Sequence, residues 1–240
     1  MKRILVLFLI LFAQSTLAQS CPDTVESFSK WMTFYYQQPD SKNISCTLQY
    51  YADSKLFSEY KNSRMPTANF YAETLLAKPE LIEELISKLN KNGSANAKIF
   101  ALHVFWVMPD DMAQVYLTKV QKLWEEEKIK IILEKMSGNR PRYPLKDGPV
   151  TSGDLDNLWA IYFASGNKQA IQQIASVLHL LEDGHGIDIA IGGAARWSLE
   201  SNSKYHKDIL GILEKMAKKE SGIQREMLIK MVKKVSANGT

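Results

Sequence analysis

One short segment of the chain, the turn at residues 182–188, contains residue types that could do chemistry. His185 stands there between Asp183 and Asp188, with a glycine on each side of the histidine. Carboxylates beside an imidazole are suited to binding a metal ion or to acting as an acid–base pair. One candidate function is therefore a metal-dependent or acid–base hydrolase that uses this turn.

The remaining residues give that hydrolase little support. A zinc site needs three or four protein ligands, and His103, His179 and His206 show no ligand spacing. Glycines and acids between two helices are also ordinary turn and capping residues. We find no Gly-rich phosphate loop, no Gly-x-Ser-x-Gly motif and no Cys-x-x-Cys pair in the sequence. We therefore expect no cofactor and favour a non-enzymatic role.

Aromatic residues offer a different kind of site. The chain contains five tryptophans, ten tyrosines and nine phenylalanines, and the tryptophans fall on predicted apolar helix faces, where packing into the core is the usual outcome. If the helices form a concave stack, some aromatics would instead line its groove and anchor a peptide or helix. The candidate groove aromatics are Trp159, Tyr162 and Trp197.

The N-terminus has the composition of a secretory signal peptide. Lys2 and Arg3 precede an unbroken apolar run at 4–13, and small residues precede the expected cleavage point after Ala18. The run is shorter than the roughly 20 residues that span a bilayer, although a short uncleaved anchor is an alternative. We predict a signal peptide over 1–18 and export to the periplasm or out of the cell. We expect no transmembrane segment.

The two cysteines of the chain, Cys21 and Cys46, both fall early in the mature protein. An exported protein meets an oxidising compartment, which favours a disulfide between them. The disulfide would close a loop of about 25 residues and would stabilise the fold by about 3 kcal/mol. The alternatives are free thiols or a lipid-anchored Cys21, and we rank the lipoprotein second because Leu17 is poorly spaced for lipoprotein processing.

Charge is distributed unevenly. The formal net charge is +4, and removal of Lys2 and Arg3 would lower it to +2. Residues 203–240 contain nine basic and four acidic side chains, which can favour anionic surfaces such as lipid headgroups. Lysines on a terminal helix more often only contact solvent, so envelope association is an alternative function. We expect no nucleic-acid partner.

Apolar residues recur with helical periodicity along nearly the whole chain. One helix is predicted from Pro79 to an end at Gly93, and another from Asp110 with a break near 125–127. Three prolines and two glycines at 138–149 interrupt the pattern. This interruption predicts a long loop at 139–150, either a plain connection or a functional loop.

Helical hairpins are predicted in the second half. Thr151 and Asp154 have the spacing of a capping box, and Gly166 ends the helix that follows. The next helix, whose apolar positions run from Ile171 to Leu181, begins after so short a turn that the two should form an αα-hairpin. A helix rich in small residues is predicted over 187–199, where adjacent glycines would permit close approach of another helix. A short strand is the alternative for the start of that segment.

These elements predict an all-α fold in which antiparallel helical hairpins stack as an α/α superhelix, similar to an α-solenoid. The expected parts are an N-terminal helical part at 19–138, the loop at 139–150 and a C-terminal hairpin part at 151–240. Together they would form one continuous domain, 19–240.

The stretch 154–168 joins an aromatic helix, a glycine turn and the start of an alanine-bearing helix, and it looks like a tetratricopeptide-type hairpin. Together with 194–199 and 207–213, it resembles uncharacterised exported bacterial proteins of helical-repeat (tetratricopeptide- or HEAT-like) character. The resemblance covers about residues 150–215. It implies an α/α superhelix with a scaffold or binding role, and it transfers no catalytic residues.

The favoured hypothesis is an exported, non-enzymatic helical scaffold that presents a groove to a protein or peptide partner. The hydrolase at 182–188 and the envelope-associated protein with basic C-terminal helices stay open as alternatives.

Overall fold

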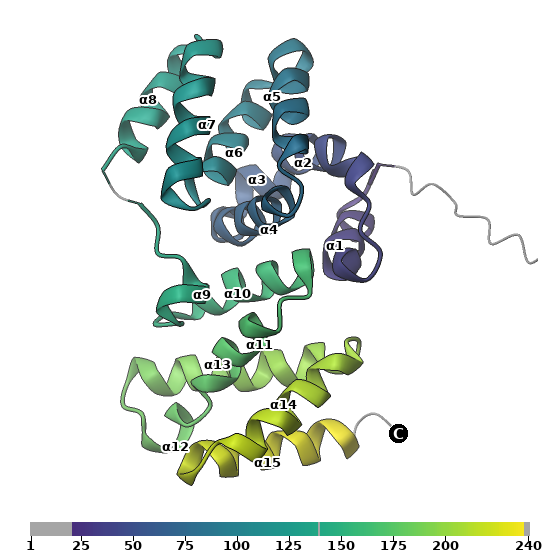
Figure 1. Cartoon of the computed structure of the whole chain (residues 1–240), viewed down its shortest axis with the longest axis vertical. Coiled ribbons are helices and arrows are strands. Elements are labelled where there is room, and N and C mark those ends of the chain that lie inside the picture. Colours follow the sequence, from purple (N-terminus) through teal and green to yellow (C-terminus); the bar gives the residue numbers. More distant parts are fainter. Residues whose placement is uncertain (1–20, 139, 238–240) are drawn as a thin grey trace, which may run out of the picture.

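The structure is a computed structural model that describes residues 21–138 and 140–237. Every regular element in these residues is a helix, and no strand occurs among them. The predicted all-α fold is therefore confirmed. The helices lie in successive layers along the longest axis of the molecule (Figure 1), whereas a regular superhelical winding of these layers stays a prediction. The predicted signal peptide at 1–18 lies outside the described residues.

The N-terminal helices fill one end of the molecule, and the C-terminal helices fill the other (Figure 1). The first set comprises α1 (Val25–Phe34), η1 (Tyr35–Gln37), η2 (Ser41–Asn43), α2 (Ile44–Asp53), α3 (Lys55–Glu59), η3 (Lys61–Ser63), α4 (Arg64–Leu76), α5 (Glu80–Asn92), α6 (Ala95–Trp106), α7 (Asp110–Leu123) and α8 (Glu127–Met136). The second set comprises α9 (Pro144–Asp147), α10 (Ser152–Ser165), α11 (Lys168–Ser176), α12 (Leu180–Asp183), α13 (Ile187–Asn202), α14 (Lys207–Lys219) and α15 (Gly222–Ala237).

The N-terminal core is built around α6. This helix is apolar on nearly every side, which is the pattern of a helix surrounded by others, and it contacts α2, α4, α7 and α8. Phe100 on α6 is fully buried, and its ring centroid lies 4.6 Å from that of Tyr51 and 5.8 Å from that of Tyr71. Aromatic side chains from three helices thus meet on α6 and hold this half together.

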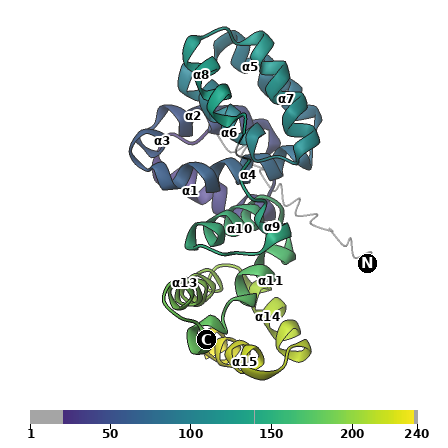
Figure 2. The same ribbon diagram turned by 90° about the vertical axis from the view of Figure 1, so that its left-hand side faces the viewer.

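Helix α10 belongs to both hydrophobic cores. Ala160 and Ala164 pack into the N-terminal core, whereas Leu158 and Ile161 pack into the C-terminal core. Helix α10 makes its most extensive contact with α4, and small side chains such as these alanines let two helices approach closely. Figure 2 shows α10 between the two halves of the molecule. The backbone of α10 is therefore held by both cores.

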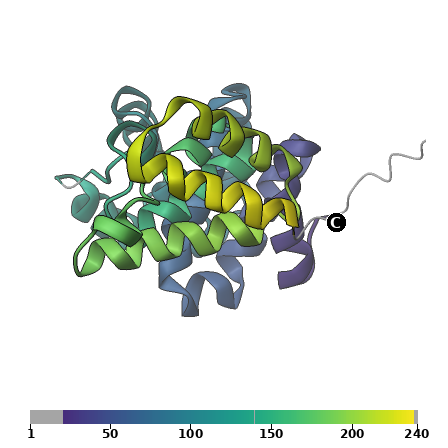
Figure 3. The same ribbon diagram turned by 90° about the horizontal axis from the view of Figure 1, so that it is seen from below.

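The far end of the molecule is made by α13, α14 and α15. Helices α14 and α15 are joined by a short turn, and Gly222, the first residue of α15, has a φ of 57°. The two helices pack along each other as an αα-hairpin (Figure 3). Helix α13 contacts α15, and α11 contacts both α13 and α14. Two helices placed so close in sequence bury each other's apolar faces, as expected for a helical hairpin.

Both ends of α10 are fixed by local chemistry. The capping box is confirmed: Asp154 N–H donates to Thr151 Oγ1 at 3.1 Å, and Thr151 N–H donates to Asp154 Oδ2 at 2.9 Å. Gly166 ends the helix with a left-handed φ of 68°, as a helix C-terminus often requires. Because an added Cβ there would lie 2.9 Å from a Tyr36 ring carbon, only glycine fits this position.

The segment after α11 differs from its prediction. Apolar spacing predicted one helix through Leu181, but α11 ends at Ser176 and a turn leads to α12. The backbone groups at this break are satisfied by Gln224 of α15, whose Nε2 donates to Ala175 O at 2.8 Å and whose Oε1 accepts from His179 N–H at 3.2 Å. A partner so distant in sequence leaves no local signal.

The predicted loop at 139–150 also differs in one respect, because it contains the short helix α9. Pro144 occupies the first turn of α9, where its missing N–H costs no intrahelical hydrogen bond.

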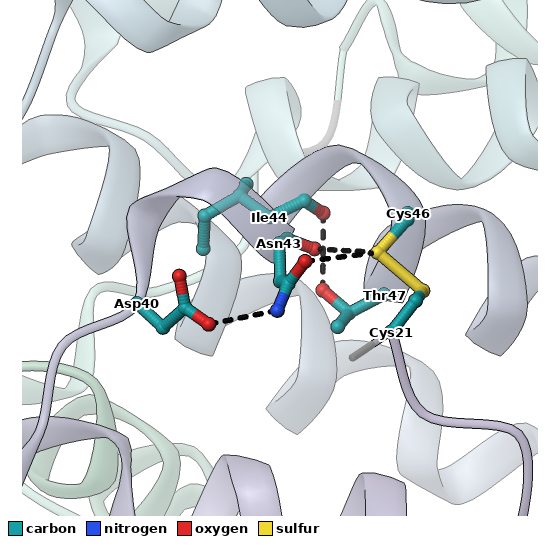
Figure 4. The surroundings of a disulfide bond; sticks show 6 residues. All are labelled: Cys21, Asp40, Asn43, Ile44, Cys46 and Thr47. Atoms are coloured by element: carbon teal, nitrogen blue, oxygen red, sulfur yellow. Dashed lines mark hydrogen bonds between the residues drawn. A yellow bond between two sulfur atoms is a disulfide. The ribbon is translucent and has the colours of Figure 1, made fainter. Parts of the chain in front are cut away.

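The predicted disulfide is confirmed. Cys21 and Cys46 are bonded, with their Cα atoms 6.0 Å apart (Figure 4). The bond ties the segment before α1 to α2, and Cys46 Sγ also lies 3.4 Å from the carbonyl oxygen of Asn43. No free cysteine occurs in the part of the chain that the structure describes.

Candidate functional site

A cleft of about 670 Å³ opens between α10 and the N-terminal half. On α10, Asp156, Trp159, Ala160 and Phe163 line it; their i, i+3, i+4, i+7 spacing places them on one helix face. The opposite wall comes from α1, α3, η3 and α4, and its residues are Met32, Glu59, Tyr60, Lys61, Asn62, Ser63, Pro66 and Thr67. The volume falls in the range of roughly 300–1,000 Å³ that is typical of ligand sites.

Stacked aromatic rings form the apolar part of the cleft. The ring centroids of Trp159 and Phe163 lie 5.6 Å apart with an interplanar angle of 27°. Trp159 is only 5% exposed, and its buried indole N–H has no hydrogen-bond acceptor. Phe163 is half-buried and packs against both cores. The aromatic wall is therefore preformed, since the fold holds both rings in place.

Three charged side chains line the cleft, and none of them forms an ion pair within the described residues. Glu59 and Lys61 lie on the N-terminal wall and Asp156 lies on α10. All three side chains are exposed, and partial desolvation by the neighbouring protein raises the pKa of the Asp156 carboxyl. A carboxylate held in this way favours a ligand that brings its own positive charge or donors.

A cluster of polar side chains lies behind the aromatic wall and consists of Tyr36, Tyr162, His206 and Asp208. Tyr162 Oη donates to Asp208 at 2.7 Å (Oδ1) and 2.8 Å (Oδ2), and it lies 2.9 Å from Tyr36 Oη. Tyr36 Oη in turn lies 2.9 Å from His206 Nδ1. The His206 ring packs against Phe163 with centroids 5.2 Å apart. This tyrosine–histidine–aspartate cluster joins η1, α10 and the start of α14.

Electrostatics indicate that this cluster positions α10. Burial, followed by the hydrogen bonds with Tyr36 and Asp208, raises the pKa of the Tyr162 hydroxyl far above its ordinary value, so Tyr162 stays a donor. Burial lowers the pKa of His206, partly opposed by Asp208, which favours a neutral imidazole. None of the four residues lines the cleft. The cluster therefore orients the helix that carries the cleft residues.

The three predicted groove aromatics have different environments. Trp159 lines the cleft, whereas Tyr162 is fully buried in the tyrosine–histidine–aspartate cluster. Trp197 is 71% exposed on α13, outside the cleft. The prediction that Trp197 lies on an apolar face is wrong, because α13 buries Ile191, Ala195 and Leu199 and position 197 is on the opposite side of that repeat.

The turn at 182–188 shows no hydrogen bond between the side chains of His185 and Asp188, although Asp188 N–H donates to His185 O at 3.1 Å. His185 is exposed, and its Nδ1 lies 2.8 Å from the carbonyl oxygen of the adjacent Gly184. Asp188 is half-buried, and the side chain of Asp183 lies outside the described part of the chain. No group of three or more potential metal ligands occurs among the described side chains. The hydrolase hypothesis stays a prediction.

The basic segments bind groups of the protein itself. Arg140 pairs with Asp110 at 3.1 Å and Arg142 with Asp147 at 3.8 Å, so both arginines of the predicted loop have partners within the protein. In α15, Lys230 and Lys234 pair with glutamates of α12 and α13. Across 21–138 and 140–237, no helix combines the length and apolarity that crossing a bilayer requires. Envelope association through the remaining lysines stays a prediction.

A second groove of about 590 Å³ lies between α7 and α8. Its indole and its arginine are already satisfied internally: the indole N–H of Trp106 donates to Met136 O at 3.2 Å, and Arg140 is paired with Asp110. The cleft beside α10 contains the Trp159–Phe163 stack and an indole N–H that has no acceptor among the described residues, and it is the better candidate for a binding site.

Comparisons with protein-family models, curated proteins and solved structures gave no match to this chain. The resemblance to helical-repeat proteins over about 150–215 therefore stays a prediction, and the function must be argued from the site itself.

Two acidic residues that line the cleft, Asp156 and Glu59, were not among the site residues predicted from the sequence. Asp156 stands three positions before Trp159, and the helical spacing of the pair was a readable signal. Glu59 carries no such signal, because it reaches the cleft only through the packing of α4 against α10.

Proposed function

We propose that this protein is an exported, non-enzymatic binding protein whose cleft beside α10 takes up a segment of a peptide or protein partner. The observation that carries the proposal is the cleft of about 670 Å³ with the Trp159–Phe163 stack in its wall. Aromatic side chains in a concave, preformed site are the usual anchors of peptide recognition. The Cys21–Cys46 disulfide supports the exported part of the proposal, since such bonds persist in oxidising compartments.

Rigidity of the site supports binding over a purely structural role for the cleft. Both cores hold α10, and the tyrosine–histidine–aspartate cluster fixes its orientation behind Phe163. A preformed site loses less conformational entropy when a ligand binds. The lack of ion pairs for Glu59, Lys61 and Asp156 leaves polar groups free for a ligand.

The test is selection of peptides from a displayed random library on the wild-type protein. We expect Asn62→Trp, which places a large ring on the exposed wall of the cleft, to abolish binding of the selected peptides. Trp197→Ala removes an exposed aromatic outside the cleft and should leave binding unchanged. Binding that survives Asn62→Trp and is lost in Trp197→Ala would place the site on α13 and refute the proposal.

A further inference from the structure

The charges around the cleft identify the chemistry of its occupant. Carboxylates stand on both walls, Glu59 on α3 and Asp156 on α10, against the single cation Lys61. Arg64 is not a lining residue, and its guanidinium is directed to Phe57, 4.4 Å from the ring centroid and with Nε donating to Phe57 O at 2.8 Å. The residues that line the cleft thus carry one more negative than positive charge.

The apolar lining adds a second requirement. Met32, Trp159 and Phe163 supply apolar lining beside the charged residues of the cleft. Lysine and arginine side chains match this combination, since their long aliphatic stems cover apolar surface while their charged heads stay at the polar edge. A bound cation would also offset the desolvation that raises the pKa of Asp156. A glutamate or aspartate ligand would meet two carboxylates and only one lysine.

We propose that the cleft recognises a lysine or arginine side chain of its peptide partner, with the aliphatic stem on the Met32–Phe163 surface and the cationic head at Glu59 and Asp156. The inference rests on the proposed function and names the occupant's chemistry. A peptide fits better than a free amino acid, because a volume of about 670 Å³ leaves space for residues that flank the cationic side chain.

The test uses four capped pentapeptides that differ only in the central residue: lysine, arginine, norleucine or glutamate. Each is titrated to millimolar concentration into the ¹⁵N-labelled full mature chain, and the indole N–H resonance of Trp159, assigned with Trp159→Phe, reports occupancy of the cleft. We expect the lysine and arginine peptides to bind about fivefold more tightly than the norleucine peptide, the ratio that one exposed ion pair supplies. Free lysine should bind more weakly than the lysine peptide.

Substitutions show which residue causes the preference for a cationic peptide. Asp156→Asn should remove about fivefold of the affinity for the lysine peptide and leave the norleucine peptide unchanged, whereas Glu214→Gln, on the exposed surface of α14, should change neither. Equal affinities for lysine and norleucine peptides would overturn the cationic preference and leave the proposed peptide cleft intact. Tightest binding of the glutamate peptide, lost in Lys61→Ala, would also overturn it. If no peptide shifts the Trp159 resonance, the proposed function fails together with this inference.

Discussion

Asp156 and Tyr162 both lie on α10, but their side chains have opposite effects on the stability of the folded protein. Asp156 is exposed and has no ion-pair partner among the described residues, and partial desolvation raises the pKa of its carboxyl. Tyr162 is fully buried and donates to the carboxylate of Asp208. An unpaired charge is retained at a cost in stability, whereas a buried donor with an ionised acceptor contributes to stability. Asp156 is therefore expected to affect ligand binding, whereas Tyr162 is expected to affect the stability of the fold.

Replacement of the unpaired acid should stabilise the protein at neutral pH. Because the folded-state pKa of Asp156 lies above its unfolded value, the carboxyl's favourable contribution is complete below the unfolded pKa of about 3.9 and is lost as the pH rises through the folded value. Asp156→Asn should thus melt at a slightly higher temperature than the wild type at pH 7. The difference should disappear on acidification to below about pH 4. A variant that is less stable at pH 7 would show that Asp156 has stabilising partners.

Loss of the Tyr162 hydroxyl should destabilise the protein. Tyr162→Phe leaves Asp208 and Tyr36 without their shared partner and should lower the free energy of unfolding by about 1–3 kcal/mol. Urea denaturation measures the change. The matched control is Tyr205→Phe, because Tyr205 is 68% exposed and its loss should be nearly neutral. If the two substitutions lowered the free energy of unfolding equally, the result would contradict a positioning role for the tyrosine–histidine–aspartate cluster.

At the scale of elements, Gly192 allows the backbones of α12 and α13 to approach closely. A Cβ added at Gly192 would lie 2.9 Å from Leu181 N and 3.2 Å from Leu180 C, whereas one at Gly193 would meet only Leu181 Cδ2 at 3.9 Å. Two adjacent glycines thus have different roles, and only the first is required by backbone packing.

This contact predicts opposite results for two neighbouring substitutions. Gly192→Ala should destabilise the protein by about 1–3 kcal/mol, because backbone atoms must move apart. Gly193→Ala should be neutral or should stabilise the helix by up to about 1 kcal/mol, since alanine is the better helix former. Thermal unfolding of the two variants side by side distinguishes them, and destabilisation by Gly193→Ala alone would contradict this packing.

Helix ends that are set by local capping or helix-breaking residues could be predicted from the sequence. The capping box at Thr151, the left-handed Gly166 and the break before α8 all lie where their residues indicate. The break at 177–179 could not be predicted, because Gln224 of a distant helix satisfies the backbone groups there. Trp197 is exposed because of which face of α13 packs against neighbouring helices. That face is decided by the tertiary packing and could not be predicted from the sequence of α13 alone.

At the scale of the whole molecule, the two halves share α10, and the cleft lies where they meet. One wall was readable as a helix face, but the other comes from residues about a hundred positions earlier in the chain. No period or motif relates these two segments. The candidate site could therefore be anticipated in type, as a groove with aromatic anchors, but its position required the fold.

The disulfide acts on the N-terminal half and lies outside the cleft. Replacing both Cys21 and Cys46 with serine should lower the free energy of unfolding by about 3 kcal/mol, because the unfolded chain regains loop entropy. Peptide binding by the folded fraction should be unchanged. Chemical denaturation and peptide titration of the same variant check both parts, and a loss of affinity in fully folded protein would link the disulfide to the cleft.

The most direct test of the account is to capture the occupant of the cleft. A photo-reactive phenylalanine derivative replaces Tyr60, an aromatic residue that lines the cleft and is 60% exposed, and is irradiated with partner peptide present. The same derivative at the exposed Tyr205 serves as the control outside the cleft. We predict an adduct at position 60 that mass spectrometry maps next to a lysine or arginine of the peptide, with none at position 205. Adducts formed equally at both positions, or at position 205 alone, would contradict a binding site beside α10.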